Sequence, residues 1–364
     1  MNLTFTKHIK NFNKKKYSSF VFGADIGGTN TRIAVAGVKK NYVKLIFSLF
    51  FKTSNTISFQ NALLECMNIS KSEFGIDLST GCISAAGVIS EDKKKVSLTN
   101  QKMKINTNEL IKKTDLKSIL LINDFEAIGY GINLLDFHDE KKVYTIRNNL
   151  KNIALKRTRA VIGAGTGLGK SILVFDKEQN FYRPISSEGG HSDLPLYTEF
   201  ERELANYIKN KRNIIEPITY DELLSGRGIE IIYQFLREKN PKKITKYIEE
   251  IDASKNKTSL ISKYKNLDEI CKEVFSIFTN FYARCAKNFV LDSLAMSGLF
   301  IAGGIAVKNK EIFNSKKFIN EFDNVYQYSN FLKKIPIFVL IDENIGLKGS
   351  CLAAMKKIEV LKYE

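Results

Sequence analysis

The sequence predicts a two-lobed α/β fold with mixed sheets flanked by helices and a cleft between the lobes. Two short glycine loops, Phe22–Arg32 and Gly163–Gly169, lie about 130 residues apart, and each is flanked by strand-forming residues. Strand-like and helix-like segments alternate along the rest of the chain. A length of 364 residues with 44% hydrophobic content is enough to bury one large or two ordinary cores.

The first lobe is expected to open with three strands and a helix, after which two more strands precede a second helix. The expected strands lie near 18–24, 31–37, 43–51, 80–85 and 118–123, and the expected helices lie near 57–74 and from about 125.

The second lobe is expected to begin near residue 135 and to contain the second glycine loop. We expect helices near 198–210, 220–238 and 264–296, strands near 298–302 and 335–341, and a last helix near 346–357. Residues 239–262 are rich in lysine and other polar residues, which predicts an insertion or a mobile surface segment.

Each glycine loop joins two strand-like runs and therefore predicts a hairpin. Glycine lets backbone N–H groups converge on a phosphate without a Cβ in the way, and Thr29 and Thr166 add hydroxyl donors. The second loop misses the P-loop pattern by one residue, and Leu168 stands where a dinucleotide-binding pattern needs its third glycine. Two ordinary turns are the alternative interpretation, but the pair favours one polyphosphate bound from two sides.

Asp25 ends an apolar run two positions before Gly27. A carboxylate there is suitably placed to hold the water shell of a phosphate-bound Mg²⁺. The alternative is an aspartate that only caps the turn.

Asn123 and Asp124 follow four apolar residues and precede a helical pattern. They are therefore expected at the carboxyl end of a buried strand, the edge at which open α/β sheets gather their ligand sites. Capping of the following helix explains an Asn or Asp at this point equally well.

The segment Ser186–Pro195 holds Glu188, Asp193, a double glycine and His191, one of only three histidines. Glu188 and His191 are suited to hydrogen bonds with the vicinal hydroxyls of a sugar. No second histidine or cysteine stands nearby at zinc-ligand spacing, and no nucleophile-elbow motif precedes the segment.

A net charge of +17 is compatible with nucleic-acid binding, but the lysines are spread through the whole chain, so we expect no nucleic-acid partner. The densest cluster lies at the N-terminus, from His8 to Lys16, and predicts a solvated basic tail. No apolar run approaches the roughly 18 to 20 residues that cross a membrane, so no membrane association is expected. The cysteines are scattered without a paired motif, which favours a cytoplasmic protein with free thiols: Cys66, Cys82, Cys271, Cys285 and Cys351.

Six motifs together carry a family resemblance. They are Asp25–Asn30, Ile122–Phe125, Gly163–Gly169, Glu188–His191, Leu224–Gly228 and Phe300–Ile305. Their order resembles that of bacterial-type glucokinases, within the hexokinase and actin-like ATPase superfamily, over residues 18 to 356. The resemblance implies the two-lobed actin-like (ribonuclease H-like) fold. It also implies a small domain of residues 18–134 plus 344–364, a large domain of residues 135–343, and a basic tail of residues 1–17.

The resemblance also implies roles for individual residues. Asp124 is similar to the general base that takes the proton from the glucose 6-hydroxyl during ATP-dependent phosphorylation to glucose 6-phosphate, the entry step of glycolysis. The implied sugar-binding residues are Asn100, Asn123, Asp124, Glu188, His191 and Asp221. The implied ATP-binding residues are Gly27, Gly28, Thr29, Asn30, Gly165, Thr166, Gly167, Gly303 and Gly304, with Asp25 on the side of Mg²⁺. A close-packed glycine turn is the alternative for Gly303 and Gly304. A homodimer is the implied assembly.

Three departures from the family pattern concern the sugar side. Asp221 stands where the family has a glutamate, and it is one methylene shorter. Val88 stands in place of a proline and Met103 in place of a tryptophan. These changes leave the preferred hexose open. A kinase for another hexose, a non-catalytic sugar sensor and an actin-type assembly protein are the alternative functions.

Overall fold

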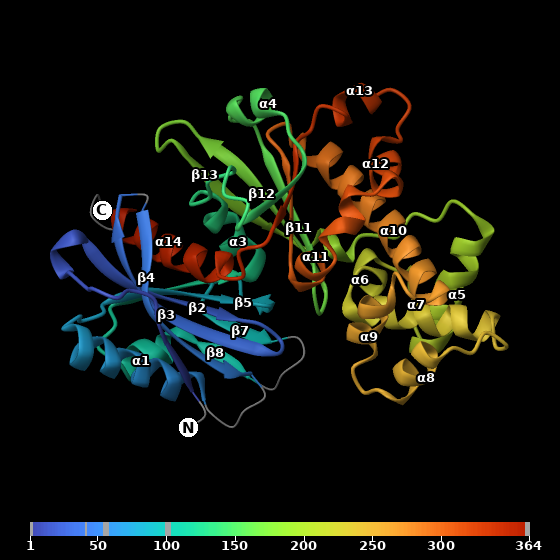
Figure 1. Cartoon of the computed structure of the whole chain (residues 1–364). Helices are drawn as coiled ribbons and strands as arrows, with labels where there is room; N and C mark the ends of the chain where they lie inside the picture. The colour runs from blue at the N-terminus through green and yellow to red at the C-terminus, as the bar shows by residue number, and fades with distance from the viewer. Residues whose placement is uncertain (1–2, 41, 54–57, 99–102, 361–364) are drawn as a thin grey trace. The chain divides into compact units, whose positions relative to one another are not determined.

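The computed structural model describes residues 3–40, 42–53, 58–98 and 103–360. The chain divides into two compact units (Figure 1). Unit 1 comprises Met1–Asp139, Phe175–Ser186 and Asp342–Glu364, and unit 2 comprises Glu140–Val174 and Ser187–Ile341. The expected boundaries had placed residues 175–186 in the second lobe. They belong to unit 1, where the Asn133 side chain bonds both the N–H and the C=O of Tyr182, at 2.8 and 2.9 Å.

Unit 1 is built on a six-stranded sheet with the order β1-β4-β3-β2-β5-β9. Its strands are β1 (Thr4–Lys7), β2 (Ser19–Ile26), β3 (Asn30–Lys39), β4 (Tyr42–Lys52), β5 (Thr80–Ala85) and β9 (Ser118–Asn123). Its helices are η1 (Lys14–Lys16), α1 (Phe59–Phe74), α2 (Thr107–Lys112), α3 (Asp124–Ile132) and α14 (Ile345–Val360). The expected strands and helices of the first lobe are confirmed to within a few residues, and β2 and β3 pair antiparallel as the expected hairpin.

Successive side chains of a strand point to opposite faces of its sheet, so a strand covered on both faces is apolar throughout. Phe22 and Ala24 of β2 join the core beneath α1, whereas Val21 joins the core beneath α14. Figure 1 shows α1 and α14 on opposite faces of this sheet. The sheet is thereby packed against a helix on each face.

Two features of unit 1 differ from the sequence-based expectation. The N-terminal segment is not wholly a solvated tail, because β1 pairs antiparallel with β4 and extends the sheet by one edge strand. A small antiparallel sheet of β6 (Gly87–Ile89), β7 (Lys95–Leu98) and β8 (Lys104–Asn106) follows β5. Its strands are only three or four residues long, and such short runs carry little periodicity.

The second sheet has the order β10-β15-β14-β11-β12-β13. Its strands are β10 (Val143–Arg147), β15 (Ile337–Leu340), β14 (Leu299–Ala302), β11 (Arg159–Ala164), β12 (Leu168–Asp176) and β13 (Phe181–Ser187). The helices of unit 2 are α4 (Leu150–Ala154), η2 (Gly189–His191), α5 (Glu199–Arg212), α6 (Tyr220–Leu223), α7 (Gly226–Lys239), α8 (Lys246–Ala253), α9 (Lys257–Tyr264), α10 (Glu269–Ser293), α11 (Gly304–Lys308), η3 (Lys310–Asn314), α12 (Lys316–Asp323) and α13 (Ser329–Leu332). The second glycine loop joins β11 to β12 as an antiparallel hairpin, which confirms that expectation.

Two expectations for unit 2 were wrong in detail. The helix expected over 220–238 is broken, because Ser225 is extended and its side chain accepts from the Gly228 N–H to start α7. The polar segment 239–262, expected to be an insertion or a mobile surface segment, is not a loose surface segment, since it contains α8 and most of α9, whose Ile248, Ile251 and Ile261 are buried in the core of the unit. The helices present one apolar stripe each, which the high lysine content obscures in the sequence.

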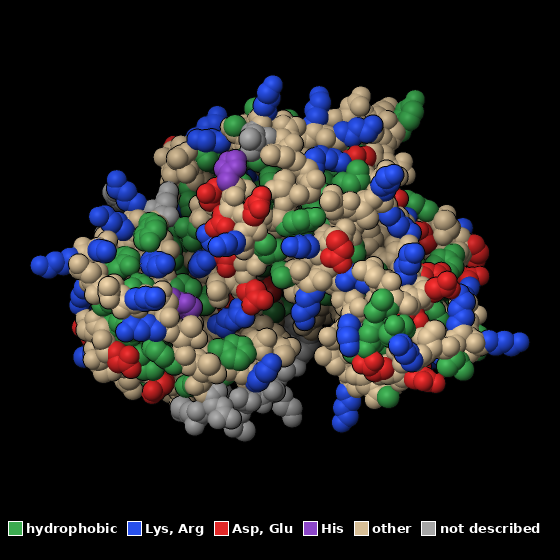
Figure 2. Space-filling view, in the orientation of Figure 1, with side chains coloured by type: hydrophobic (Ala, Val, Ile, Leu, Met, Phe, Trp, Pro, Cys, Tyr) green, Lys and Arg blue, Asp and Glu red, His purple; other side chains and the backbone are tan. Residues whose placement is uncertain are grey.

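No helix among the described residues is long and apolar enough to cross a membrane. Lysine and arginine side chains are scattered over the face shown in Figure 2, with acidic side chains among them. All five cysteines are buried as free thiols.

Candidate active site

The first glycine turn and Asp124 lie at the same edge of the unit 1 sheet. β2, β5 and β9 are parallel neighbours, and Ile26, Ala85 and Asn123 are in register across them. Ile26 is the last residue of β2 before the turn, and Asn123 is the last residue of β9 before α3. Neighbouring strands are about 4.8 Å apart, so these ends are separated by roughly 10 Å.

The first turn is closed by a hydrogen bond from the Gly27 N–H to the Asn30 carbonyl, at 3.0 Å. Thr53, the residue after β4, holds this turn in place. Its N–H donates to the Thr29 carbonyl at 2.9 Å, and its hydroxyl donates to the Gly27 carbonyl at 2.8 Å. The Asn30 side chain accepts from Lys52 Nζ at 3.0 Å. The carbonyls of Gly27 and Thr29 are both bonded to Thr53, so the turn is fixed. Thr29 is exposed at its tip.

Asp25 is half-buried in β2, opposite Arg32 of β3 and Ser84 of β5. Ser84 Oγ lies 3.4 Å from Asp25 Oδ1. Removal from water raises the pKa of the Asp25 carboxyl above its usual range, and the Arg32 charge and the Ser84 hydroxyl oppose that rise. A Cβ added to Gly346, in the first turn of α14, would lie 3.6 Å from Asp25 Oδ2. The carboxylate therefore has backbone close beside it and little freedom to move.

Asn123 has the capping role that the sequence left open. Its side-chain oxygen accepts from the Phe125 N–H at 2.8 Å, and Asp124 Oδ1 accepts from the same N–H at 3.0 Å. Both side chains are half-buried. A capping Asn123 fixes the direction in which α3 leaves β9, and it thereby fixes the position of Asp124, the first residue of that helix. Capping and catalysis are therefore compatible here.

The second glycine turn is tight and is held at both ends. The Gly165 N–H donates to the Gly167 carbonyl at 2.8 Å, and the Gly226 N–H donates to the Gly165 carbonyl at 2.9 Å. Thr166 is exposed at the tip. Gly303, with φ of 93°, packs against this hairpin, because a Cβ there would lie 2.6 Å from the Ala164 carbonyl oxygen. The close-packed turn considered for Gly303 is thus present, whereas Gly304 faces open space.

Asp221 lies directly beneath the second glycine turn. Its Oδ1 accepts from the Leu168 N–H at 2.6 Å, and its Oδ2 accepts from Arg227 Nη2 at 3.1 Å. Only 6% of the residue is exposed. The structure places this predicted sugar-binding carboxylate against the backbone of the second glycine turn.

Glu188 precedes the short helix η2, His191 is the last residue of that helix, and both are exposed. Two glycines pack this turn onto β12. A Cβ on Gly190 would lie 2.1 Å from the Leu168 carbonyl oxygen, and the Gly189 carbonyl accepts from Lys170 Nζ at 2.8 Å. The hydroxyl-binding candidates and the second glycine turn are thus brought together at one end of β12.

The sequence analysis did not identify Lys170 as a residue that supports this turn. It is 4% exposed, and its Nζ lies 5.2 Å and 5.1 Å from the ring centroids of Tyr220 and Phe289. A lysine inside the mostly apolar segment Leu168–Val174 was the available signal, since lysine is almost never fully buried without a partner. Thr53, which fixes the first turn, offered no comparable signal.

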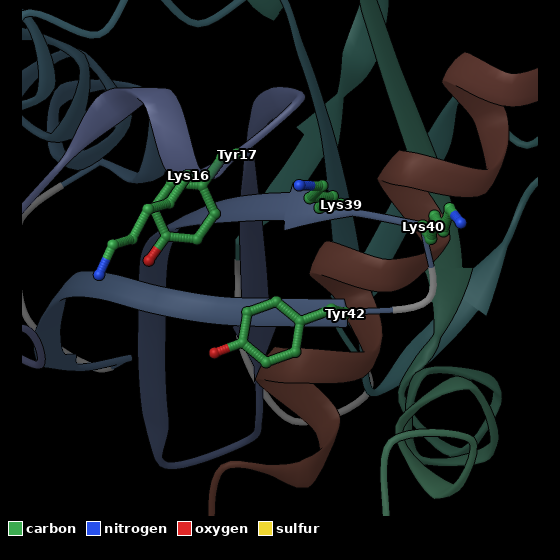
Figure 3. A pocket seen from close by; sticks show the side chains of 5 residues that line it. All are labelled: Lys16, Tyr17, Lys39, Lys40 and Tyr42. Atoms are coloured by element: carbon green, nitrogen blue, oxygen red, sulfur yellow. The ribbon is translucent and has the colours of Figure 1, made fainter.

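The predicted residues fall into two groups, one in each unit. Unit 1 contains Asp25, Gly27, Gly28, Thr29, Asn30, Asn123 and Asp124, and unit 2 contains Gly165, Thr166, Gly167, Glu188, His191, Asp221, Gly303 and Gly304. Asn100 lies outside the described residues. A hollow of about 690 Å³ in unit 1 is separate from these residues; it is lined by Lys16, Tyr17, Lys39, Lys40 and Tyr42 (Figure 3).

Known proteins are similar to this chain over most of its length. A family model described as Glucokinase matches residues 22–357. The glucokinase of Trichormus variabilis is 28% identical over 352 residues, covering 93% of this chain and 99% of the relative. The glucokinase of Colwellia psychrerythraea is 29% identical over 335 residues, covering 90% and 93%.

Solved structures show the fold. Glucokinase from Balamuthia mandrillaris in complex with glucose superposes with a TM-score of 0.78 at 21% identity, covering 93% of this chain and 94% of that one. A ROK family glucokinase from Streptomyces griseus in complex with glucose and AMPPNP gives a TM-score of 0.63 at 16% identity, covering 93% and 100%. The actin-like ATPase fold expected from the sequence is confirmed. Because the family model spans most of the sequence, the chain belongs to the glucokinase family.

Proposed function

We propose that the protein transfers the γ-phosphoryl group of ATP to the 6-hydroxyl of D-glucose, with Asp124 as the general base. Family membership makes it an ATP-dependent hexose kinase. The observation that supports the residue assignment is the register of β2, β5 and β9, which puts Asp124 and the first glycine turn at one sheet edge. Ligand sites of α/β sheets form at such edges.

Phosphoryl transfer depends mainly on alignment and on stabilising charge, so the demands on Asp124 are modest. Its carboxylate accepts the proton of the attacking hydroxyl as that oxygen bonds to the γ-phosphorus. The bond from this phosphorus to the bridging oxygen breaks at the same time, and ADP leaves with the electron pair. The N-terminal position of Asp124 in α3 and the cap made by Asn123 hold the carboxylate in one place. Such positioning supports its role as the general base.

The two glycine turns are proposed to bind the phosphates of ATP. Thr29 and Thr166 are exposed at the tips of turns whose backbones are fixed by internal hydrogen bonds. Preorganised N–H and hydroxyl donors stabilise the charge on the transferring group without reorganising.

The metal implied by ATP chemistry is Mg²⁺. Among the described residues no group of three or more His, Cys, Asp or Glu could hold a metal ion. Mg²⁺ keeps several waters and binds through one or two carboxylates and the substrate phosphates, so a single protein carboxylate suits it. Asp25, half-buried at the end of β2, is the carboxylate proposed for this shell. When bound, Mg²⁺ neutralises phosphate charge.

Glu188 and His191 are proposed to bind sugar hydroxyls, since both are exposed on a turn packed against the second glycine loop. Val88, at the position of the family proline, is 77% exposed. Because residues on the sugar side depart from the family pattern, the preferred hexose is determined by experiment together with the reaction.

The test is phosphoryl transfer from Mg·ATP to glucose, mannose, fructose and N-acetylglucosamine. Asp124→Asn keeps the size of the side chain and removes the base, so we expect kcat for glucose to fall by about 100- to 10,000-fold. Asp115→Asn, an exposed aspartate of the same unit, is the matched control and should keep its full rate.

Near-normal turnover by Asp124→Asn would refute the role of this carboxylate. Faster transfer to another sugar than to glucose would change the assigned substrate. Glucose binding by the wild type without transfer to any sugar would support the sensor.

A further inference from the structure

The hollow in unit 1 lies where the β3–β4 hairpin meets η1 (Figure 3). Its volume of about 690 Å³ falls in the range of small-molecule sites, about 300 to 1,000 Å³. Three lysines and two tyrosines line it, and no acidic residue is among the described residues of its lining: Lys16, Tyr17, Lys39, Lys40 and Tyr42. None of these five residues is assigned to phosphoryl transfer.

The two strands of the hairpin place Lys39 and Tyr42 on one face of the sheet. Lys39 of β3 pairs directly with Tyr42 of β4, and directly paired residues of neighbouring strands project from the same face. Gly37 stands two residues before Lys39 and therefore shares that face. A Cβ on Gly37 would lie 2.5 Å from the Tyr17 ring, so this ring covers the same face. One ammonium group and two aromatic rings are thus gathered there.

Tyr17 is a fixed wall of the hollow. The residue after it, Ser18, donates to the Val38 carbonyl through both its N–H and its hydroxyl, each at 2.9 Å. The Tyr17 ring also packs edge-on against Phe20, with the ring centroids 5.7 Å apart. The wall is therefore held in place by the sheet and its core before any ligand binds.

The lysines of the hollow carry uncompensated charge. Lys16, Lys39 and Lys40 are exposed, and none of them forms an ion pair with a described residue. Lys16 ends η1, and Lys40 follows β3 in the left-handed region, with φ of 52°. Several cations around one concave surface attract an anion, and a phosphate accepts hydrogen bonds from more than one ammonium group.

Tyr42 supplies an exposed aromatic ring beside these cations. It is 56% exposed, and its ring has no aromatic partner among the described residues. Figure 3 shows the hydroxyls of Tyr17 and Tyr42 directed to the same side as the Lys16 ammonium group. Burial raises the pKa of the Tyr17 hydroxyl, and the nearby Tyr42 adds to that rise, so the Tyr17 hydroxyl keeps its proton as a donor. The surface suits a ligand that has a ring as well as a phosphate.

We propose that this hollow binds a small phosphate ester, whose phosphate contacts the lysines and whose ring packs on Tyr42. A nucleoside monophosphate and a hexose phosphate share this chemistry. The site goes beyond the proposed function, because it uses none of the residues assigned to the reaction.

The test is calorimetry on the full chain with AMP, glucose 6-phosphate and inorganic phosphate. Glucose and a non-hydrolysable ATP analogue with Mg²⁺ are present at saturation, so that the proposed active site is occupied. We expect one of the two esters to bind one-to-one and about tenfold or more tighter than inorganic phosphate, because its ring packs on Tyr42. The tighter ester shows whether the ring is a base or a sugar.

Substitutions at exposed positions separate the two halves of the site. Tyr42→Ala should weaken the ester about tenfold and leave inorganic phosphate within about twofold, whereas Tyr42→Phe keeps the ring and should bind the ester within about twofold of the wild type. Lys39→Gln should weaken the ester and inorganic phosphate alike, by about tenfold at low salt. The matched controls are Tyr326→Ala and Lys117→Gln, which change exposed residues outside the hollow. All of these variants should keep the kcat of the wild type for glucose.

No saturable binding of either ester below about 1 mM would overturn the proposal. Equal Kd values for inorganic phosphate and both esters would also overturn it, because they indicate unspecific attraction to a basic surface. Ester binding that survives both Tyr42→Ala and Lys39→Gln would place the ligand elsewhere on the protein and reject this site. If the wild type binds neither glucose nor the ATP analogue, the proposed kinase activity fails, whereas the variants still decide the role of the hollow.

Discussion

Lys170→Met tests whether a buried cation fixes the turn that carries Glu188 and His191. Lys170 Nζ donates to the Gly189 carbonyl at 2.8 Å, and Gly189 lies between Glu188 and the rest of η2. Methionine keeps the unbranched apolar stem between Tyr220 and Phe289 but has no donor. The substitution therefore removes the hydrogen bond while conserving most of the packing.

The size of the effect follows from the remaining partners of that carbonyl. A hydrogen bond to a charged group contributes about 1.5 to 3 kcal/mol. Ser192 Oγ also donates to the Gly189 carbonyl, at 2.7 Å, so the oxygen keeps a partner and we expect the lower value, about 1.5 kcal/mol. At 1.4 kcal/mol per factor of ten, KM for glucose should rise about tenfold.

The assay is steady-state kinetics with each substrate varied in turn, after a melting curve has shown that the variant is folded. KM for ATP should stay within about twofold, because the second glycine turn keeps its own hydrogen bonds. The matched control is Lys177→Met, which changes an exposed lysine directly after β12. A raised KM for ATP with an unchanged KM for glucose would refute the reasoning.

Three further substitutions probe unit 1. Asp25→Asn removes the charge proposed to face the Mg²⁺ shell, so the Mg²⁺ concentration for half-maximal activity should rise by about tenfold, and an unchanged Mg²⁺ titration would count against this assignment. Gly349→Ala places a Cβ 1.8 Å from the Ala127 carbonyl oxygen where α14 crosses α3. It should lower the free energy of unfolding by about 1 to 3 kcal/mol in a denaturant titration, whereas Gly75→Ala should lower it through its positive φ alone, since nothing lies within 4 Å of the added Cβ.

The glycine hairpins were predictable because their signals are local. A glycine-rich turn between two strand-forming runs specifies a hairpin without reference to the rest of the chain, and both hairpins are present. The placement of Asn123 at the end of β9 was predictable for the same reason, since four apolar residues followed by a helix cap define a strand end.

Other features depended on contacts between distant segments. Residues 246–264 form two helices because Ile248, Ile251 and Ile261 find a core to enter, and the lysine-rich sequence alone does not reveal that core. β1 exists because β4 offers an unpaired edge 40 residues away, as the hydrogen bond between His8 and Ser48 next to it illustrates.

The sequence by itself determined the family, the strand and helix order around both glycine turns, and the residue types available for the chemistry. Only the tertiary structure decided what each polar side chain contacts. Asp221 faces the backbone of Leu168, and Lys170 faces the carbonyl of Gly189, because β12 runs past both α6 and η2. A hydrogen bond depends on distances of a few tenths of an ångström between atoms that are remote in the chain, and no local pattern encodes those distances.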